Sequence, residues 1–239
     1  MIDIHCHFLP GLDDGAKSLD ESLAMARASV GNGIRHAIMT PHIQPGRYEN
    51  TRTLIEIGFE RFRQALEDAL IPLKIGMAAE VRVSPEIMGL LEKDELPFLG
   101  ESDGYRVLLL EFPHNHIPPG SGKLIDFLLS KKIRPLIAHP ERNRDVIRKL
   151  SKIDPFIDMG CLLQITASSL VGIFGDGPLE RARQLLERRA CMVLATDAHN
   201  LEARRPMLRE GVAVAAEIIG VDAAHDLVHK NPLQILGCH

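Results

Sequence analysis

The sequence predicts an α/β fold whose parallel strands close into a barrel, and two observations carry this prediction. First, short apolar runs alternate with longer amphipathic segments about seven times, without a long linker or a low-complexity tract. Such alternation is typical of a parallel sheet, either closed or open. Second, nearly every apolar run ends in a histidine or a carboxylate, and only in a barrel do all strand ends converge on one mouth. The length of 239 residues suits a single domain over residues 1–239.

The strands are predicted from runs that are apolar almost throughout, as expected for strands buried on both faces. These runs are residues 2–5, 34–40, 74–80, 105–112, 133–139, 161–166 and 191–197. The helices are predicted from apolar residues that recur with the period of one helical face, and the first begins with the capping box SLDE. They cover residues 18–32, 51–70, 121–131, 144–150, 178–190 and 205–220, followed by two short helices in 222–236.

Composition and charge exclude several functional classes. The formal net charge of −4 leaves no electrostatic footprint for nucleic acid or for an anionic membrane. The longest apolar stretches have the length of strands, so no membrane insertion is predicted. Met1 directly precedes the first strand and leaves no room for a signal peptide, which predicts a cytoplasmic protein. The four cysteines lie far apart, which argues against a disulfide framework or a structural zinc site.

Two pairs of polar residues end the first and last predicted strands. His5 and His7 are two residues apart, so on a strand both side chains face one way and Cys6 faces the other. Two imidazoles on one face form half of a mononuclear metal site. One such pair is equally compatible with a structural role. Asp197 and His199 repeat the spacing, and two pairs in one chain favour metal binding.

The remaining strand ends extend this set. His42 and His139 each adjoin a proline that stops a strand, and Glu80 ends an apolar run, where it could also simply leave the core for solvent. Glu111 follows three leucines, and a carboxylate buried there needs a partner or a metal. A carboxylate from the DDGA stretch, at position 13 or 14, completes five histidines and four carboxylates.

Nine nitrogen and oxygen ligands are too many for one ion and suit two or three ions that share ligands. The absence of thiolate ligands favours a hydrolytic site for Mn, Fe, Zn or Mg over a structural zinc site. Such a site attracts a phosphate dianion, lowers the pKa of a bound water and stabilises both ends of an in-line displacement. The sequence therefore predicts metal-assisted hydrolysis of a phosphate ester.

Seven motifs, in order, resemble one known family. They are DIHCHFLPGLDDGA, TPH, AAEVR, LLLEFP, IAHPER, QITASSLVGIFG and ATDAHN. They are similar to the PHP (polymerase and histidinol phosphatase) superfamily and, within it, to the bacterial manganese-dependent protein-tyrosine phosphatases of capsule and exopolysaccharide operons, the CpsB/YwqE group. The resemblance runs from residue 2 to about residue 205. It implies a distorted (β/α)7 TIM-like barrel with a metal site at the C-terminal ends of the strands.

The resemblance also implies a set of ligands for two or three ions, with manganese as the first expectation. One ion would take His5, His7, Glu80 and Asp197, a second Glu80, Glu111 and His139, and a third Asp14, His42 and His199. The choice of Asp14 over Asp13 rests on the resemblance alone. Arg142 and Arg204 match phosphate-contacting arginines of the group, although Arg204, beside Arg205, also fits a solvated helix start.

The implied reaction is hydrolysis of phosphotyrosine by a metal-bridging hydroxide. Arg142 and Arg204 would neutralise the phosphoryl oxygens, and His42 or His199 would steer a proton. The implied partner is a phosphotyrosine protein, namely the C-terminal tail of a bacterial tyrosine kinase that regulates capsule or exopolysaccharide synthesis. The alternatives are a phosphatase for a small monoester such as histidinol phosphate and a catalytically silent PHP scaffold. The oligomeric state stays open.

A cysteine-based tyrosine phosphatase is excluded. That mechanism needs a cysteine and an arginine six residues apart in one phosphate loop. The residues six after Cys6, Cys161 and Cys191 are, in turn, Leu12, Ala167 and Asp197.

Overall fold

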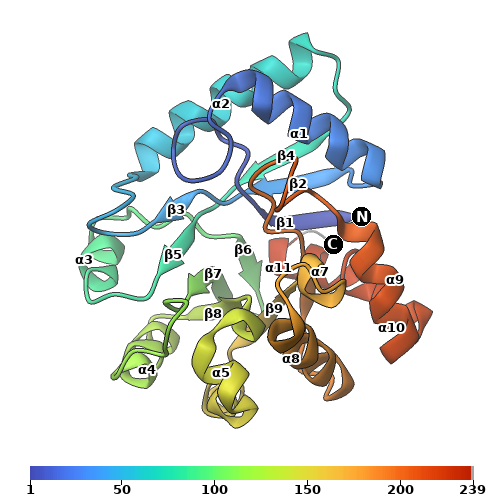
Figure 1. The fold of residues 1–239 in the computed structure, drawn as a ribbon. Coiled ribbons are helices and arrows are strands. Elements are labelled where there is room, and N and C mark those ends of the chain that lie inside the picture. Colours follow the sequence, from blue (N-terminus) through green and yellow to red (C-terminus); the bar gives the residue numbers. More distant parts are fainter. Residues whose placement is uncertain (238–239) are drawn as a thin grey trace.

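The computed structural model describes residues 1–237, and its strands form a ring with helices around the outside (Figure 1). The strands are β1 Ile2–Cys6, β2 His36–Met39, β3 His42–Ile43, β4 Lys74–Met77, β5 Glu80–Arg82, β6 Gly100–Ser102, β7 Tyr105–Glu111, β8 Ile133–Ala138, β9 Leu162–Thr166 and β10 Val193–Ala195. The helices are α1 Leu19–Asn32, α2 Arg52–Asp68, α3 Ile87–Glu92, α4 Ser121–Ser130, α5 Arg144–Arg148, α6 Asp154–Asp158, α7 Ala167–Leu170, α8 Asp176–Glu187, α9 Leu208–Ile219, α10 Val221–Asp226 and α11 Lys230–Leu236.

Two of the predicted strands are each interrupted, so that seven parallel strands carry nine labels. β2 and β3 are halves of one strand around Pro41, and β4 and β5 are halves of the next. Proline has no backbone N–H and therefore interrupts the ladder. The backbone amide of Glu80 nevertheless donates to the carbonyl of Pro41 at 3.2 Å, which continues the pairing across the break. The order of neighbours is β1-β2-β4 in one sheet and β3-β5-β7-β8-β9-β10 in the other.

Backbone hydrogen bonds also join the first strand to the chain that follows the last one. The amide of Asp197 donates to the carbonyl of His5 at 2.8 Å, and the amide of His7 donates to the carbonyl of Ala198 at 2.9 Å. With these bonds the strands make a complete circuit. The predicted α/β fold with a distorted, TIM-like barrel is confirmed.

Several short elements were not predicted. β6 pairs antiparallel with β7, and α3 and α7 have only six and four residues. The helix predicted over 144–150 ends at Arg148 and is followed by a 3₁₀ turn and by α6. Segments this short give no recognisable period, so periodicity alone does not reveal them.

The interior of the ring is apolar at the N-terminal ends of the strands. Ile4, Leu109 and Leu136 pack there with Ile235 of α11, which lies behind the centre of the ring in Figure 1. We call this apolar cluster the plug. α11 approaches β6 so closely that a Cβ on Gly100 would lie 2.5 Å from the carbonyl oxygen of Ile235, which explains the glycine.

Two composition-based expectations can be compared with the structure. Among the described residues, Cys6, Cys161 and Cys191 are free, and Cys238 lies outside that range. Within residues 1–237, no helix combines the length and apolar character needed to cross a membrane.

Candidate metal centre and phosphate site

The first strand delivers its two histidines to the C-terminal mouth of the ring. The Nε2 atoms of His5 and His7 lie 3.2 Å apart, and both side chains are fully buried. The Cys6 thiol contacts the carbonyl of Ile38 instead, in agreement with the predicted alternation. β1 therefore places two imidazole nitrogens side by side.

A carboxylate from each of two other strands meets these imidazoles. One oxygen of Glu80 lies 3.2 Å from Nε2 of His5 and 3.4 Å from Nε2 of His7. One oxygen of Asp197 lies 3.4 Å from each of the same nitrogens. The four ligand atoms all lie within 4.8 Å of one another, as one ion requires. This is the group that the resemblance implies for the first ion.

Glu80 also faces a second group. Its other oxygen lies 2.9 Å from Nε2 of His139, which in turn lies 3.8 Å from Glu111. Nδ1 of His42 lies 3.0 Å from Glu80 and 3.8 Å from Glu111. The Glu80 carboxylate thus stands between the two groups, where a bridging ligand would stand.

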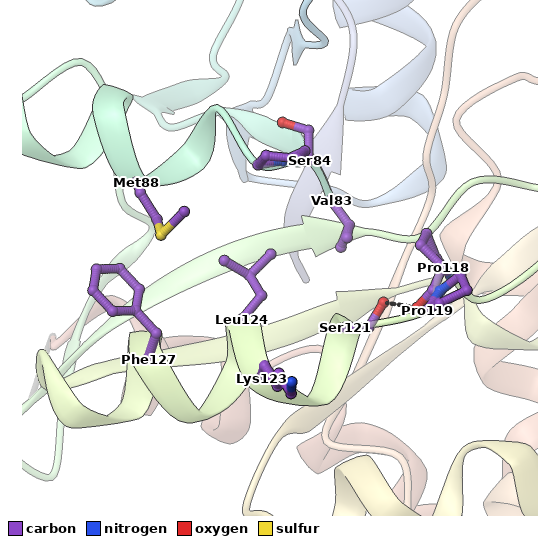
Figure 2. A pocket seen from close by; sticks show the side chains of 11 residues that line it. Val83, Ser84, Met88, Pro118, Pro119, Ser121, Lys123, Leu124 and Phe127 are labelled. Carbon is purple, nitrogen blue, oxygen red and sulfur yellow. Dashed lines mark hydrogen bonds between the residues drawn. The ribbon is translucent and has the colours of Figure 1, made fainter.

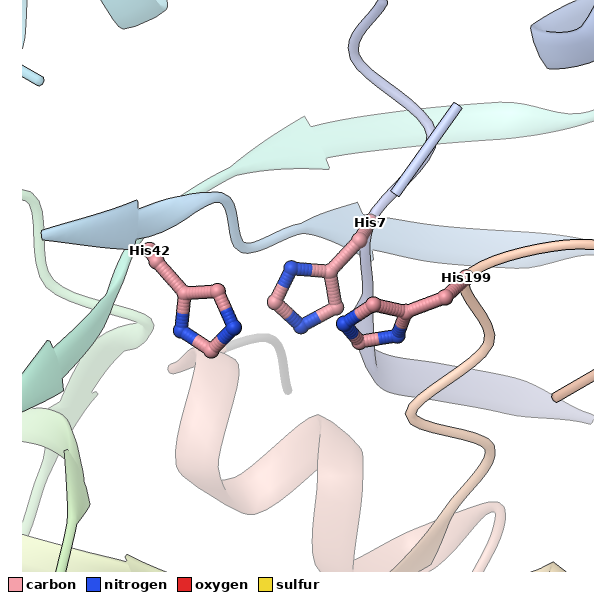
Figure 3. A group of neighbouring side chains, drawn as sticks. All are labelled: His7, His42 and His199. Carbon is pink, nitrogen blue, oxygen red and sulfur yellow. The ribbon is translucent and has the colours of Figure 1, made fainter. Parts of the chain in front are cut away.

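Three histidines form the third side of the mouth (Figure 3). The ring centroids of His7 and His199 lie 3.9 Å apart, and those of His7 and His42 lie 4.6 Å apart. Asp14 approaches Nε2 of His42 at 3.3 Å and Nε2 of His199 at 3.6 Å. All nine side chains predicted as metal ligands therefore lie in one connected cluster.

The adjacent residues Asp13 and Asp14 contact the histidines from opposite sides. Asp13 accepts a bond from Nδ1 of His7 at 2.7 Å and one from the amide of His42 at 3.0 Å, so it lies behind the histidines. Asp14 lies in front of them, at the open side of the mouth. Gly15 makes this turn possible, because a Cβ there would collide with the carbonyl oxygen and Cβ of His7. These contacts explain the DDGA stretch residue by residue.

Gln164 of β9 is a contact residue that the sequence analysis missed. Its Oε1 lies 2.9 Å from Nδ1 of His5 and 3.3 Å from the amide of His139. Such contacts behind a ligand fix the orientation and tautomer of a metal-binding imidazole. The signal available in the sequence was a single amide residue within the mainly apolar run CLLQIT, and the structure shows that it is fully buried.

Both predicted arginines lie at the mouth. Arg142 and Arg204 each contact the second oxygen of Asp197, Arg204 at 2.6 Å. The Arg142 guanidinium also lies 4.3 Å from the ring centroid of Phe174. Arg205 is exposed and lines a separate hollow beside Asn32. Of the two neighbouring arginines, Arg204 is the one directed at the site.

The arginines border a hollow of about 290 Å³ over the cluster, which we call the phosphate hollow. It is lined by Asp14, His42, Arg47, Arg82, Glu111, His114, His139, Arg142 and Arg204. Arg82 was not predicted, although it follows Glu80 by two residues and so shares its face of the strand. His114 lines the hollow, whereas His116 is exposed outside it.

Two site residues have strained backbones. His139 has a φ of 34° and Asp197 a φ of 51°, in the left-handed region that side chains with a Cβ rarely adopt. His139 comes one residue after the end of β8 and Asp197 two residues after the end of β10, and each turns the chain at the mouth. Strain of this kind clusters at functional sites, where the surrounding structure holds it in place.

The electrostatics of the cluster are those of a crowded, buried site. Burial opposes the charge on Asp197, yet Arg204, His5 and Arg142 hold its pKa well below the usual range. Burial and Arg142 lower the pKa of His139 to about 4. Burial, together with the charge of Glu80, raises the pKa of Glu111 to about 7.

The donor set fits divalent cations. Among the described residues, Oδ1 of Asp197 and Nε2 of His199 are buried site atoms without a hydrogen-bond partner. Buried polar atoms are normally satisfied, and lone pairs directed at a common centre are what a cation needs. The ligands are imidazoles and carboxylates, which suit hydrolytic first-row metals.

Comparison with known proteins agrees with this geometry. The family described as capsular polysaccharide synthesis, CpsB/CapC, matches residues 1–237. Tyrosine-protein phosphatase YwqE of Bacillus subtilis (strain 168) is 35% identical over 233 residues, covering 98% of this chain and 91% of the relative. Tyrosine-protein phosphatase CpsB of Streptococcus pneumoniae is 33% identical, covering 99% of this chain and 98% of the relative.

Solved structures give the same result. A crystal structure from work on YwqE and CpsB, described as unique metal-dependent tyrosine phosphatases, matches with a TM-score of 0.91 at 34% identity, covering 100% of this chain and 96% of that one. An amidohydrolase from Mycoplasma synoviae matches with a TM-score of 0.64 at 12% identity, covering 99% of this chain and 87% of that one, a likeness of fold alone. The predicted membership is confirmed: the chain belongs to the CpsB/CapC family of capsular polysaccharide synthesis proteins.

Proposed function

We propose that this chain is a metal-dependent protein-tyrosine phosphatase, that is, a phosphoric monoester hydrolase. The observation that carries the proposal is the connected cluster of five histidines and four carboxylates below an arginine-lined hollow. The relatives named tyrosine-protein phosphatases support the substrate class over a small monoester such as histidinol phosphate. A silent scaffold would have no reason to keep so many charges buried together.

We assign two or three divalent ions to the cluster, with manganese as the first expectation and Fe, Zn or Mg as alternatives. The proposed ligands are His5, His7, Asp14, His42, Glu80, Glu111, His139, Asp197 and His199. Divalent ions bound by such a set supply a water of lowered pKa and neutralise charge that develops on phosphoryl oxygens.

The protein's own groups bind and orient the phosphate. Arg142 and Arg204 both contact one oxygen of Asp197 and border the phosphate hollow, so their remaining N–H groups are available to phosphoryl oxygens. A guanidinium fork is well matched to a phosphate. The face of Phe174 holds the Arg142 head in place through a cation–π contact.

Departure of the leaving group needs little help from a proton donor of the protein. A phenolate leaves readily because the phenol of tyrosine has a pKa near 10, so a strong general acid is unnecessary. His42 and His199 lie beside Asp14 at the open side of the cluster, and one of them would steer the proton.

For the physiological substrate we propose the C-terminal tail of a bacterial tyrosine kinase that regulates capsule or exopolysaccharide synthesis. The support is the family description together with the names of the relatives. Because such a kinase consumes ATP, we propose that the reaction takes place in the cytoplasm. Loss of this chain should raise the phosphotyrosine content of that kinase, which immunoblotting of a deletion strain would measure.

The direct test compares two substrates under two metal conditions. Hydrolysis of a phosphotyrosine peptide and of histidinol phosphate would be measured with manganese and after complete chelation. We expect manganese-dependent hydrolysis of the peptide, lost on chelation and restored by added metal. Activity that survives chelation would refute the metal site, and a strong preference for histidinol phosphate would refute the substrate class.

A further inference from the structure

A second hollow lies between α3 and α4, and nothing in the proposed chemistry uses it (Figure 2). Its volume is about 350 Å³, within the range of small-molecule sites. It is lined mainly by apolar side chains, among them Val83, Met88, Pro118, Pro119, Leu124 and Phe127. We call it the apolar groove.

Two chain segments contribute residues to both the apolar groove and the phosphate hollow. Arg82 lines the hollow and the next residue, Val83, lines the groove. The amide of Val83 donates to the carbonyl of Glu111 at 2.9 Å, so one hydrogen bond separates a groove residue from a proposed ligand. The loop after β7 also contributes to both sites, because His114 lines the hollow and Pro118 lines the groove.

The loop after β7, which contributes a residue to each hollow, is held in place by hydrogen bonds and forms a fixed wall. The side-chain amide of Asn143 donates to the carbonyl of Pro113 at 2.8 Å. The amide of Ile117 donates to Asp145 at 3.1 Å, and the hydroxyl of Ser121 donates to the carbonyl of Pro118 at 2.7 Å. Binding against a wall fixed in this way loses little conformational entropy.

The chemistry of the apolar groove selects one kind of occupant. Met88 is 44% exposed, and Leu124 and Phe127 are half-buried, so the groove presents apolar surface to solvent. Methionine adapts its shape to different apolar side chains. In the neighbouring phosphate hollow, Arg47 and Arg82 join the two arginines proposed to contact phosphate. A ligand that occupies both hollows carries a phosphate and, close by, an apolar group.

We infer that the apolar groove receives an apolar side chain of the phosphoprotein substrate, a few residues from the phosphotyrosine. The inference rests on the proposed function, because the phosphate must be seated in the hollow. A fully extended chain advances about 3.3–3.6 Å per residue, so neighbours of the phosphotyrosine reach the adjoining groove without a long spacer. The groove thus acts as a specificity site for sequence around the phosphotyrosine.

The test is a positional scan, in which a single leucine is moved along a phosphotyrosine peptide. In an otherwise serine- and glycine-based peptide, one leucine would be placed in turn at each position up to about four residues from the phosphotyrosine on either side. We expect one or two adjacent positions to raise kcat/KM on the order of 10-fold, mainly through KM, as burial of one apolar side chain allows. The variants Met88→Asp and Leu124→Asp should abolish that preference.

Two further measurements keep the outcomes distinct. Hydrolysis of p-nitrophenyl phosphate, measured for every variant, reports the metal centre and the folded state, and the peptide rates are normalised to it. Ile57→Asp is the matched control, because Ile57 is 63% exposed on α2 and lines neither hollow; it should keep the leucine preference. If the enzyme is active and leucine changes kcat/KM at no position, the proposed role of the groove is wrong, and the proposed phosphatase function is unaffected. No hydrolysis of any phosphotyrosine peptide with metal present would overturn the function itself.

Discussion

The two ends of the barrel interior both contain fully buried side chains, but their chemistry is opposite. Leu109 and Ile235 in the plug are inaccessible to solvent, and so are His5 and Glu80 in the metal cluster. Burial of the plug stabilises the fold through the hydrophobic effect. Burial of charged and polar groups in the cluster costs free energy unless partners compensate for it.

The change from one chemistry to the other takes place within two residues of the same strand. Leu109 and Glu111 of β7 face the same way, because side chains alternate along a strand, and the first joins the plug while the second joins the cluster. The contrast shows how the fold divides its tasks. The N-terminal half of the ring stabilises the structure, so that the C-terminal half can hold groups that destabilise it.

The largest loss of activity is expected when the carboxylate charge of Glu80, which several histidines of the cluster contact, is removed. Glu80→Gln should bind metal poorly and lower kcat/KM by more than the ~10–100-fold that loss of an outer contact costs, because Glu80 contacts His5, His42 and His139. Metal content by elemental analysis and peptide hydrolysis would check this. Glu101→Gln, on exposed β6 at the opposite end, is the matched control and should behave as wild type. A Glu80→Gln enzyme with full metal content and activity would contradict the assignment.

The corresponding change in the plug should affect stability and leave the chemistry alone. Ile235→Ala removes a fully buried side chain from the plug and should lower the free energy of unfolding by about 2–5 kcal/mol. Urea unfolding measures this loss. Activity per folded molecule should stay unchanged, and a selective loss of activity would show that the two ends are more strongly coupled than the structure indicates.

A smaller effect is expected just behind the cluster. Asp13→Asn keeps the shape of the side chain but weakens the contact with His7 Nδ1, so metal affinity should fall ~10–100-fold while kcat at saturating metal stays close to that of wild type. Titration of the metal-free enzyme with manganese would show the shift. If kcat at saturating metal fell as well, Asp13 would have a role beyond orientation.

The smallest effect is expected at Arg204, and it tests whether Arg204 rather than Arg205 contacts the phosphate. Arg204→Lys retains the charge but loses the fork that reaches Asp197, and KM for a phosphotyrosine peptide should rise about 10-fold, as expected for loss of a hydrogen bond between charged groups. Arg205→Lys changes an exposed neighbour in a separate hollow and should leave KM unaltered. Equal effects of the two substitutions would remove the distinction between them.

The sequence predicted the barrel because its strand ends carry an unusual signal, with a histidine or carboxylate closing nearly every apolar run. The same signal predicted eight of the nine side chains that the structure brings together, and the choice of Asp14 as the ninth came from the family resemblance. It did not predict Gln164 or Arg82, since their contacts depend on how β9 and β5 are placed across the ring. A local pattern shows that a polar residue interrupts an apolar run or shares a strand face with a proposed ligand, but only the packing across the ring shows which residue it contacts.

The short elements escaped prediction for a related reason. β6 pairs with β7, which follows it after two residues, and packs against α11, which is distant in the sequence. Its three residues are too few to show the alternation of a strand. The break at Pro41 was visible as a strand stop, but the resumption of pairing through His42 and Glu80 depends on register. Register becomes apparent only in the folded ring.

The bonds that close the ring have a consequence for synthesis of the chain. The carbonyl of His5 and the amide of His7 are paired with Asp197 and Ala198, which leave the ribosome long after the first strand. A nascent chain that has not yet reached these residues lacks the last wall of the cluster. The proposed metal site would therefore be complete only after these residues have been synthesised and have paired with the first strand.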